Sequence, residues 1–248
     1  MNDLHESGRT SPTRLALIAA GVVCSLTMAG AQAEPSSRVS LITGKQSQSG
    51  SMNRQSAEIG NASGAARSNT AVGAVIQGQA GALNAQSMRI GNAKGRGQSE
   101  VAVGAAIQGQ AGALNLQSMQ IGNSSGNGRS RVAVGAAIQG QVGAMNLQQM
   151  RIGESKGNGR ANVAVGAAIQ GQAGALNAQR MNVGNAAGSG RTNVRAGAIQ
   201  QYQAGLLNSQ NVAIGNNSTS GSTNVTVGNV IQGQLGIGQV QSIRLGNR

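Results

Sequence analysis

Side-chain amides are the groups of this chain whose types and spacing could act together, because glutamine and asparagine recur at intervals of 31 residues. A buried amide can donate to the amide above it and accept from the amide below it, so a column of amides forms a hydrogen-bond ladder. A buried amide without such partners would cost about 1–3 kcal/mol. The spacing therefore predicts contacts between stacked repeats.

Four amide columns and one glycine column carry this prediction. The first two glutamine columns are Gln46, Gln77, Gln108, Gln139, Gln170, Gln201, Gln232 and Gln48, Gln79, Gln110, Gln141, Gln172, Gln203, Gln234. The asparagine column is Asn53, Asn84, Asn115, Asn146, Asn177, Asn208, followed by Gln239, and the third glutamine column is Gln55, Gln86, Gln117, Gln148, Gln179, Gln210, Gln241. The glycines expected at an arch between strands are Gly50, Gly81, Gly112, Gly143, Gly174, Gly205 and Gly236.

Catalytic and metal-binding residue types are scarce. From Glu34 onward the chain has no cysteine, histidine or aspartate, and its acids are Glu34, Glu58, Glu100 and Glu154. These acids are far apart in the repeat, so neither a nucleophile–base pair nor a carboxylate pair is available. Metal sites lack their usual nitrogen and sulfur ligands. We therefore expect no enzyme activity and no cofactor.

Residues 1–33 resemble an export signal. Arg9 and Arg14 precede the apolar run Leu15–Gly30, and Ala31–Ala33 has the small-x-small pattern of a cleavage site, which places the mature start at Glu34. A transmembrane anchor is the alternative, although the run is short for a span. The chain carries a net charge of +13. This charge favours anionic partners such as lipopolysaccharide, acidic polysaccharide, extracellular DNA or a membrane surface, or else serves solubility.

The elements that must position the amides are two strands in each repeat. The first is expected over Val101–Gln108 and the second over Asn115–Ile121, joined by a tight arch at Ala111–Leu114 and followed by a longer loop, Asn123–Arg131. In the second strand Asn115, Gln117, Met119 and Ile121 alternate with more polar positions, which is typical of a strand with one inward face. The facing of the Gln108 and Gln110 columns stays open.

Glycine also recurs within the first strand, at Gly73, Gly104, Gly135, Gly166, Gly197 and Gly228. We interpret this column as a small-residue position that lets stacked sheets approach closely. A helical repeat is disfavoured, because three glycines in each unit would cost about 1 kcal/mol each. Disorder is also disfavoured, because a disordered chain does not need a fixed period that keeps valine and isoleucine in register.

The sequence therefore predicts an all-β protein: residues 34–248 form a parallel, cross-β and amyloid-like β-solenoid of seven strand–arch–strand repeats. Their approximate bounds are 37–67, 68–98, 99–129, 130–160, 161–191, 192–222 and 223–248. No proline interrupts the repeats and no unit resembles a polar cap, so open strand edges are expected. Glutamines on the surface of a soluble solenoid are the alternative reading of the columns.

The repeated pattern Gln-x-Gly-x-x-Asn, as in Gln110, Gly112 and Asn115 with Gln117 two residues later, resembles the curlin repeat of curli-type bacterial functional amyloids. The family's repeat is shorter and has aromatic residues that this chain lacks apart from Tyr202. The resemblance implies a secreted subunit of extracellular fibres for biofilm matrix and adhesion, with an outer-membrane pore and a nucleator as partners. The segment Asn211–Asn217 also resembles head repeats of trimeric autotransporter adhesins. A soluble basic solenoid that binds anionic glycans or lipopolysaccharide is the alternative function.

Overall fold

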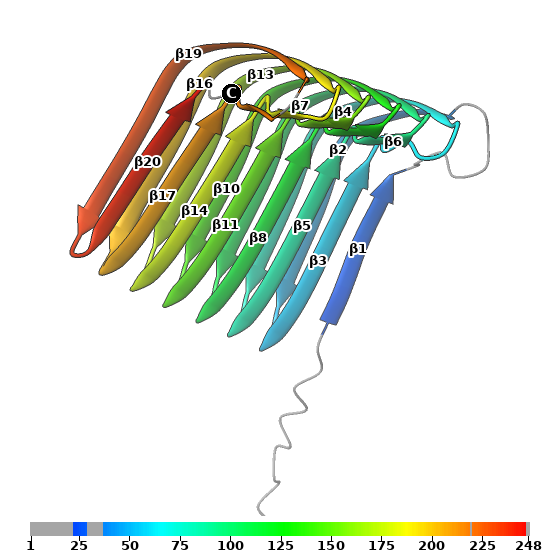
Figure 1. Ribbon diagram of the computed structural model, residues 1–248. Coiled ribbons are helices and arrows are strands. Elements are labelled where there is room, and N and C mark those ends of the chain that lie inside the picture. Colours follow the sequence, from blue (N-terminus) through cyan, green and yellow to red (C-terminus); the bar gives the residue numbers. More distant parts are fainter. Residues whose placement is uncertain (1–21, 29–36, 219, 247–248) are drawn as a thin grey trace, which may run out of the picture.

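The computed structural model describes residues 22–28, 37–218 and 220–246, and these form three parallel β-sheets wound as one β-solenoid (Figure 1). Each strand pairs with the strand 31 residues away, as in Arg129 with Arg160 and Asn146 with Asn177. Neighbouring strands in a sheet lie about 4.8 Å apart, so each repeat adds one rung to the stack. The predicted all-β parallel solenoid with a 31-residue repeat is confirmed.

The first sheet has seven strands and contains the longest strands of the fold. They are β2 (Ser37–Ser49), β4 (Arg67–Ala80), β7 (Gln98–Ala111), β10 (Arg129–Val142), β13 (Arg160–Ala173), β16 (Arg191–Gly205) and β19 (Ser222–Gly236).

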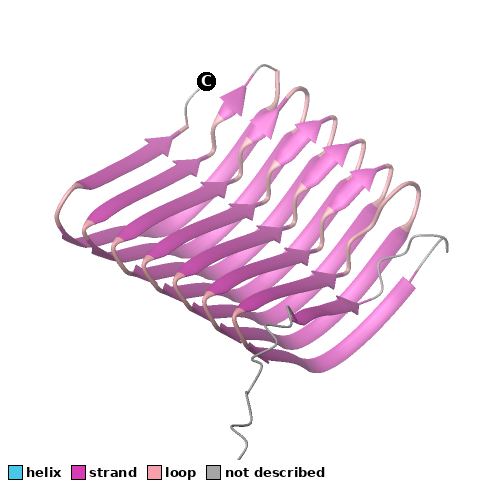
Figure 2. Cartoon of the chain, turned by 90° about the horizontal axis from the view of Figure 1, so that it is seen from below, coloured by secondary structure: helices cyan, strands magenta, loops and turns pink. Residues whose placement is uncertain are grey.

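The second sheet has eight strands and packs against the first (Figure 2). It consists of β1 (Val22–Met28), β3 (Met52–Ile59), β5 (Leu83–Ile90), β8 (Leu114–Ile121), β11 (Met145–Ile152), β14 (Leu176–Val183), β17 (Leu207–Ile214) and β20 (Gln239–Leu245). Of the predicted export signal, only the β1 segment lies within the described residues. Its backbone pairs with β3, also at an offset of 31 residues.

A third sheet of five short strands corrects the expected strand–arch–strand–loop unit. The Gly-rich segment expected to be a loop contains a further strand, because its backbone also pairs with its copy in the next repeat. These strands are β6 (Ala93–Gly95), β9 (Ser124–Gly126), β12 (Ser155–Gly157), β15 (Ala186–Ala187) and β18 (Asn217–Ser218).

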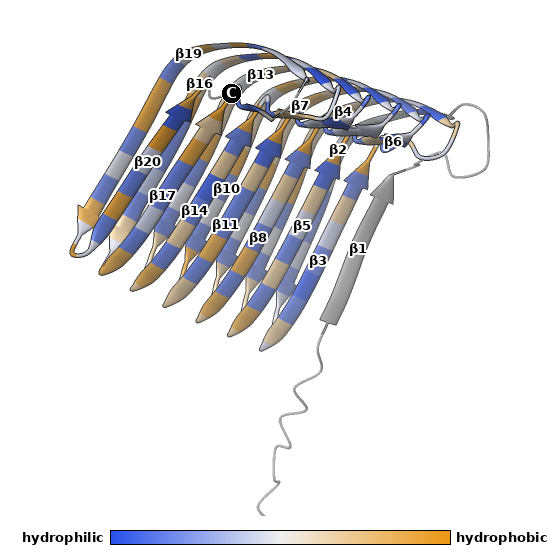
Figure 3. Cartoon of the chain, in the orientation of Figure 1, coloured by the Kyte–Doolittle hydropathy of each residue, from blue (hydrophilic) through white to orange (hydrophobic). Residues whose placement is uncertain are grey.

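The apolar core lies between the first two sheets and is built from methionine, isoleucine, valine and alanine side chains, without aromatic residues. Met88, Met119, Met150 and Met181 form one fully buried column from the second sheet. Valine and alanine columns of the first sheet face them. Bands of equal hydropathy run across neighbouring strands (Figure 3), because identical residues stack in register. Period-two burial in β8 confirms the predicted inward facing of Asn115, Gln117, Met119 and Ile121.

The glycine column of the first strand marks a bend, which corrects our interpretation of it. Val101 and Val103 face inward, Gly104 and Ala105 both face away from the core, and inward facing resumes at Ala106. The paired register passes over Gly104 and Gly135. A Cβ on Gly135 would collide with the carbonyl oxygen of Gly104 in the adjacent coil. Glycine is required here for contact between coils of one sheet and not for the approach of two sheets.

Candidate functional site

The bend in the first strand decides how the first two glutamine columns face. Because the alternation restarts at Ala106, Gln108 and Gln110 both point into the solenoid, and they are 1% and 5% exposed. Across the arch, Asn115 and Gln117 of β8 point inward from the other side, and Gln117 is completely buried. All four amide columns therefore line the interior at the arch end of each coil. The alternative of surface glutamines is wrong for these columns.

Within the three glutamine columns, each glutamine after the first donates toward the N-terminal end of the stack. The Nε2 atoms of Gln108, Gln110 and Gln117 lie 2.8, 2.7 and 2.8 Å from the Oε1 atoms of the equivalent residues one repeat earlier. The second N–H of Gln117 donates to the carbonyl oxygen of Gly140 at 3.2 Å. The Oε1 of Gln117 accepts from Gln148 Nε2 at 2.9 Å, so both donors and the acceptor of this buried amide are satisfied without water.

The asparagine column has the opposite polarity. Asn115 Nδ2 lies 2.9 Å from Asn146 Oδ1, one repeat later, and also donates to the carbonyl oxygens of Gly112 at 3.1 Å and Val142 at 3.0 Å. These bonds hold the arch of one coil onto the arch of the next. The ladders contain the amides expected to stack, namely Gln77, Gln79, Asn84, Gln86, Gln108, Gln110, Asn115, Gln117, Gln139, Gln141, Asn146, Gln148, Gln170, Gln172, Asn177, Gln179, Gln203, Asn208 and Gln210. Gln239, which ends the asparagine column, instead donates to the carbonyl oxygen of Gly236 at 2.8 Å.

The arch glycines lie where these asparagines contact the backbone. A Cβ on Gly112 would collide with the carbonyl oxygen of Gly81 and would approach Asn84 Nδ2. The same collision with the preceding glycine of the column arises at Gly81, Gly143, Gly174, Gly205 and Gly236. Glycine is therefore needed for the close stacking of arches that brings the asparagine ladder within hydrogen-bond distance.

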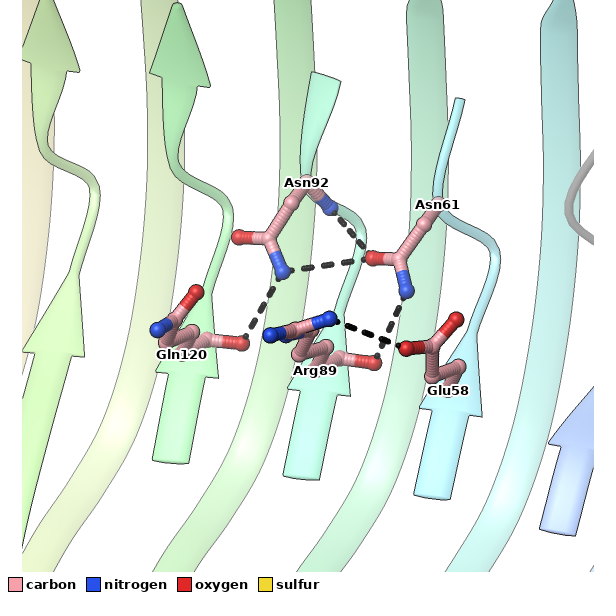
Figure 4. A network of polar contacts seen from close by, with 5 residues as sticks. All are labelled: Glu58, Asn61, Arg89, Asn92 and Gln120. Atoms are coloured by element: carbon pink, nitrogen blue, oxygen red, sulfur yellow. Dashed lines mark hydrogen bonds and ion pairs between the residues drawn. The ribbon is translucent and has the colours of Figure 1, made fainter. Parts of the chain in front are cut away.

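A further asparagine column was not identified from the sequence. It follows the second strand, where Asn61 Oδ1 accepts from the backbone N–H and the Nδ2 of Asn92 at 2.9 and 3.2 Å (Figure 4). Beside it, Arg89 forms an ion pair of 3.1 Å with Glu58, also across one repeat. The recurring Ile-Gly-Asn at Ile59–Asn61 and Ile121–Asn123 was the available signal. This column ties the turn after the second strand to its neighbours.

Glu154 occupies the position of this asparagine in one repeat. Its backbone N–H donates to Asn123 Oδ1 at 2.9 Å, as an asparagine would there. Burial raises the pKa of the Glu154 carboxyl, while Arg151 and hydrogen bonds from Asn182 and Asn185 oppose this in part. Glu154 is therefore a carboxylate whose charge is poorly compatible with its surroundings.

The ladders end in amide groups that lack hydrogen-bond partners among the described residues. At the N-terminal end these groups are Gln55 Nε2 and Asn53 Oδ1, and at the C-terminal end the group is Gln234 Oε1. The ends are complementary in kind, since the third glutamine column begins with an unpaired donor and the second ends with an unpaired acceptor. The last coil also exposes apolar side chains whose equivalents in the preceding coil are buried, for example Ile243 and Leu245, which follow Val212 and Ile214.

The described residues offer few groups for other chemistry. They contain no group of three or more histidine, cysteine, aspartate or glutamate residues that could hold a metal ion. Within the same ranges there is no helix long and apolar enough to cross a bilayer. No protein-family model, curated protein or solved structure matches the chain.

Proposed function

We propose that the chain is a secreted structural subunit, which stacks end to end into curli-like extracellular amyloid fibres for biofilm matrix and surface adhesion. The observation that carries this proposal is the complementarity of the two ends of the solenoid. Within the described part of the chain, Gln55 Nε2 and Asn53 Oδ1 have no partner at one end, and Gln234 Oε1 has none at the other. In an in-register stack Gln55 would face Gln241 of the neighbouring molecule, and Gln234 would face Gln48. A second molecule placed in register would continue the ladders.

The backbone edges also favour growth along the solenoid axis. Strands β19 and β20 form one edge of the first two sheets, and an edge strand presents unpaired N–H and C=O groups to a new strand. At the other edge of the second sheet, β1 pairs with β3. If the predicted leader is removed, β3 becomes the exposed edge, so processing and assembly would be coupled.

Fibre formation by the predicted mature chain, residues 34–248, tests this proposal. We expect Thioflavin-T-positive fibres with a meridional reflection near 4.7–4.8 Å, the spacing of strands along a cross-β axis. Preformed fibres should remove the lag phase. A chain that stays monomeric for days at high concentration would contradict the proposal.

Edge-blocking variants make the test specific. Successive N–H groups of a strand point alternately to its two sides, and β20 has a neighbouring strand on only one side. Of the variants Ser242→Pro and Ile243→Pro, one therefore removes a donor that faces the free edge. That variant should keep the circular dichroism of the parent but stop growth when added at a small fraction of the parent concentration. Unchanged elongation with both variants would argue against growth through β20.

The alternative function is a soluble solenoid that binds anionic glycans or lipopolysaccharide, supported by the net charge of +13. Salt-sensitive binding by a protein that never forms fibres would favour this alternative.

A further inference from the structure

Arginine side chains form a column along one side of the solenoid, at the start of the first-sheet strands. Arg67, Gln98, Arg129, Arg160 and Arg191 are in backbone register. Together with the column two residues later, which includes Arg38, Glu100 and Arg131, they line a groove of about 980 Å³. We call this surface the arginine groove. It runs along the stacking axis.

The charges in this groove are not balanced within the described residues. Six arginines and one glutamate line it, and that glutamate, Glu100, lies 3.5 Å from Arg131. The other two acids of the repeats, Glu58 and Glu154, pair with arginines of the second sheet. No carboxylate between residues 37 and 246 therefore remains for Arg67, Arg129, Arg160 or Arg191.

The arrangement is unfavourable for the isolated protein. Arg129, Arg160 and Arg191 lie directly beside one another on adjacent strands, about 4.8 Å apart along the stack. Like charges directly opposite each other destabilise a sheet. An anion held between neighbouring guanidinium groups would remove the repulsion, and guanidinium binds carboxylate and sulfate in bidentate geometry.

We propose that the arginine groove binds a linear acidic polysaccharide lying along the solenoid axis. Such a polymer carries an anion on each sugar unit. Its regularly spaced charges would lie opposite the arginines that recur on successive strands of the groove. Asn69, Asn162 and Asn193 of the groove supply amides for sugar hydroxyls. The lining contains no aromatic side chain on which nucleic-acid bases could stack. Such binding requires only the folded solenoid and does not depend on fibre formation.

Binding of fluorescently labelled alginate, a polyuronate, to the full chain tests the proposal by anisotropy at a protein concentration below the onset of assembly. Arg160→Gln should weaken binding about tenfold, through loss of one charge-assisted contact, and should also raise the urea midpoint of the free protein. The matched control is Arg180→Gln on β14, whose partners in register are Gln149 and Asn211. It removes the same charge but should change neither quantity appreciably.

Three results would overturn the inference. Equal weakening by both variants would show binding through net charge alone. Tighter binding of single-stranded DNA than of alginate of matched charge would assign the groove to nucleic acid. Absence of alginate binding at low salt would show that the groove has no such ligand. Because the readout is binding by the unassembled chain, failure here leaves the fibre proposal intact, and a failure to form fibres leaves this one intact.

Discussion

Replacing one glutamine in the middle of a ladder gives the most direct test of what stabilises the solenoid. Gln117 is fully buried, donates to Gln86 Oε1 at 2.8 Å and accepts from Gln148 Nε2 at 2.9 Å. Gln117→Leu nearly preserves the volume, so the cavity term is small. It leaves Gln86 Oε1 without a donor, whereas Gln148 Nε2 keeps the carbonyl oxygen of Gly171 at 3.1 Å.

The expected cost follows from these two groups. A fully orphaned buried acceptor costs about 1–3 kcal/mol and a half-satisfied donor costs less, so unfolding should become easier by about 2–4 kcal/mol. Gln241→Leu is the matched control, because Gln241 lies at the exposed end of the same column and only donates to Gln210, at 3.3 Å. Its cost should stay below about 1 kcal/mol.

Urea unfolding of the unassembled chain, followed by far-ultraviolet circular dichroism, measures both variants. A double variant adds a second check. Gln86→Leu with Gln117→Leu should cost less than the sum of the single changes, because each single change orphans a group that the double variant lacks. Equal losses for Gln117→Leu and Gln241→Leu, or strictly additive losses for the pair, would refute the ladder argument.

Two further predictions concern single positions. The pKa of Glu154 is raised in the folded state, so its protonated form is favoured there, and stability is lost as pH rises through that pKa. Glu154→Gln should therefore raise the thermal midpoint at about pH 7, and the gain should disappear toward about pH 4; a gain that is independent of pH would exclude this cause. In β10, Gly135→Ala should destabilise the protein by about 2 kcal/mol or more because its Cβ meets the Gly104 carbonyl oxygen, whereas Gly140→Ala has open space and should be nearly neutral, as measured by urea unfolding.

Much of the fold could be predicted because repetition is a property of the sequence itself. A strict 31-residue step aligns identical residues, and identical amides or methionines can be buried together only if the repeats stack in register. The alternation of Asn115, Gln117, Met119 and Ile121 was sufficient to orient the second strand. No comparable inference was possible for the third sheet, since its short strands are Gly- and Ser-rich and depend on pairing with copies of themselves.

The first strand shows where prediction from sequence stopped. Gln108 and Gln110 follow a glycine bend at which two successive residues face outward. Every later side chain of the strand therefore faces the side opposite to the one that simple alternation predicts. At this bend a Cβ on Gly104 would collide with the carbonyl oxygen of Gly73 in the neighbouring coil, so the position requires glycine. Likewise, the column of Asn61 and Asn92 bonds to a backbone N–H of another repeat, a contact that local spacing does not reveal.

The sequence by itself determined the period, the parallel stacking and the residues that form columns, because these follow from which side chains recur and at what spacing. The tertiary structure decided which columns face inward, which way each ladder donates, and what remains unpaired at the ends. Those properties arise only when one coil lies on another, because the ladder partner of an amide is in the adjacent coil. The backbone atoms that leave no room for a Cβ at the bend and arch glycines are also in the adjacent coil.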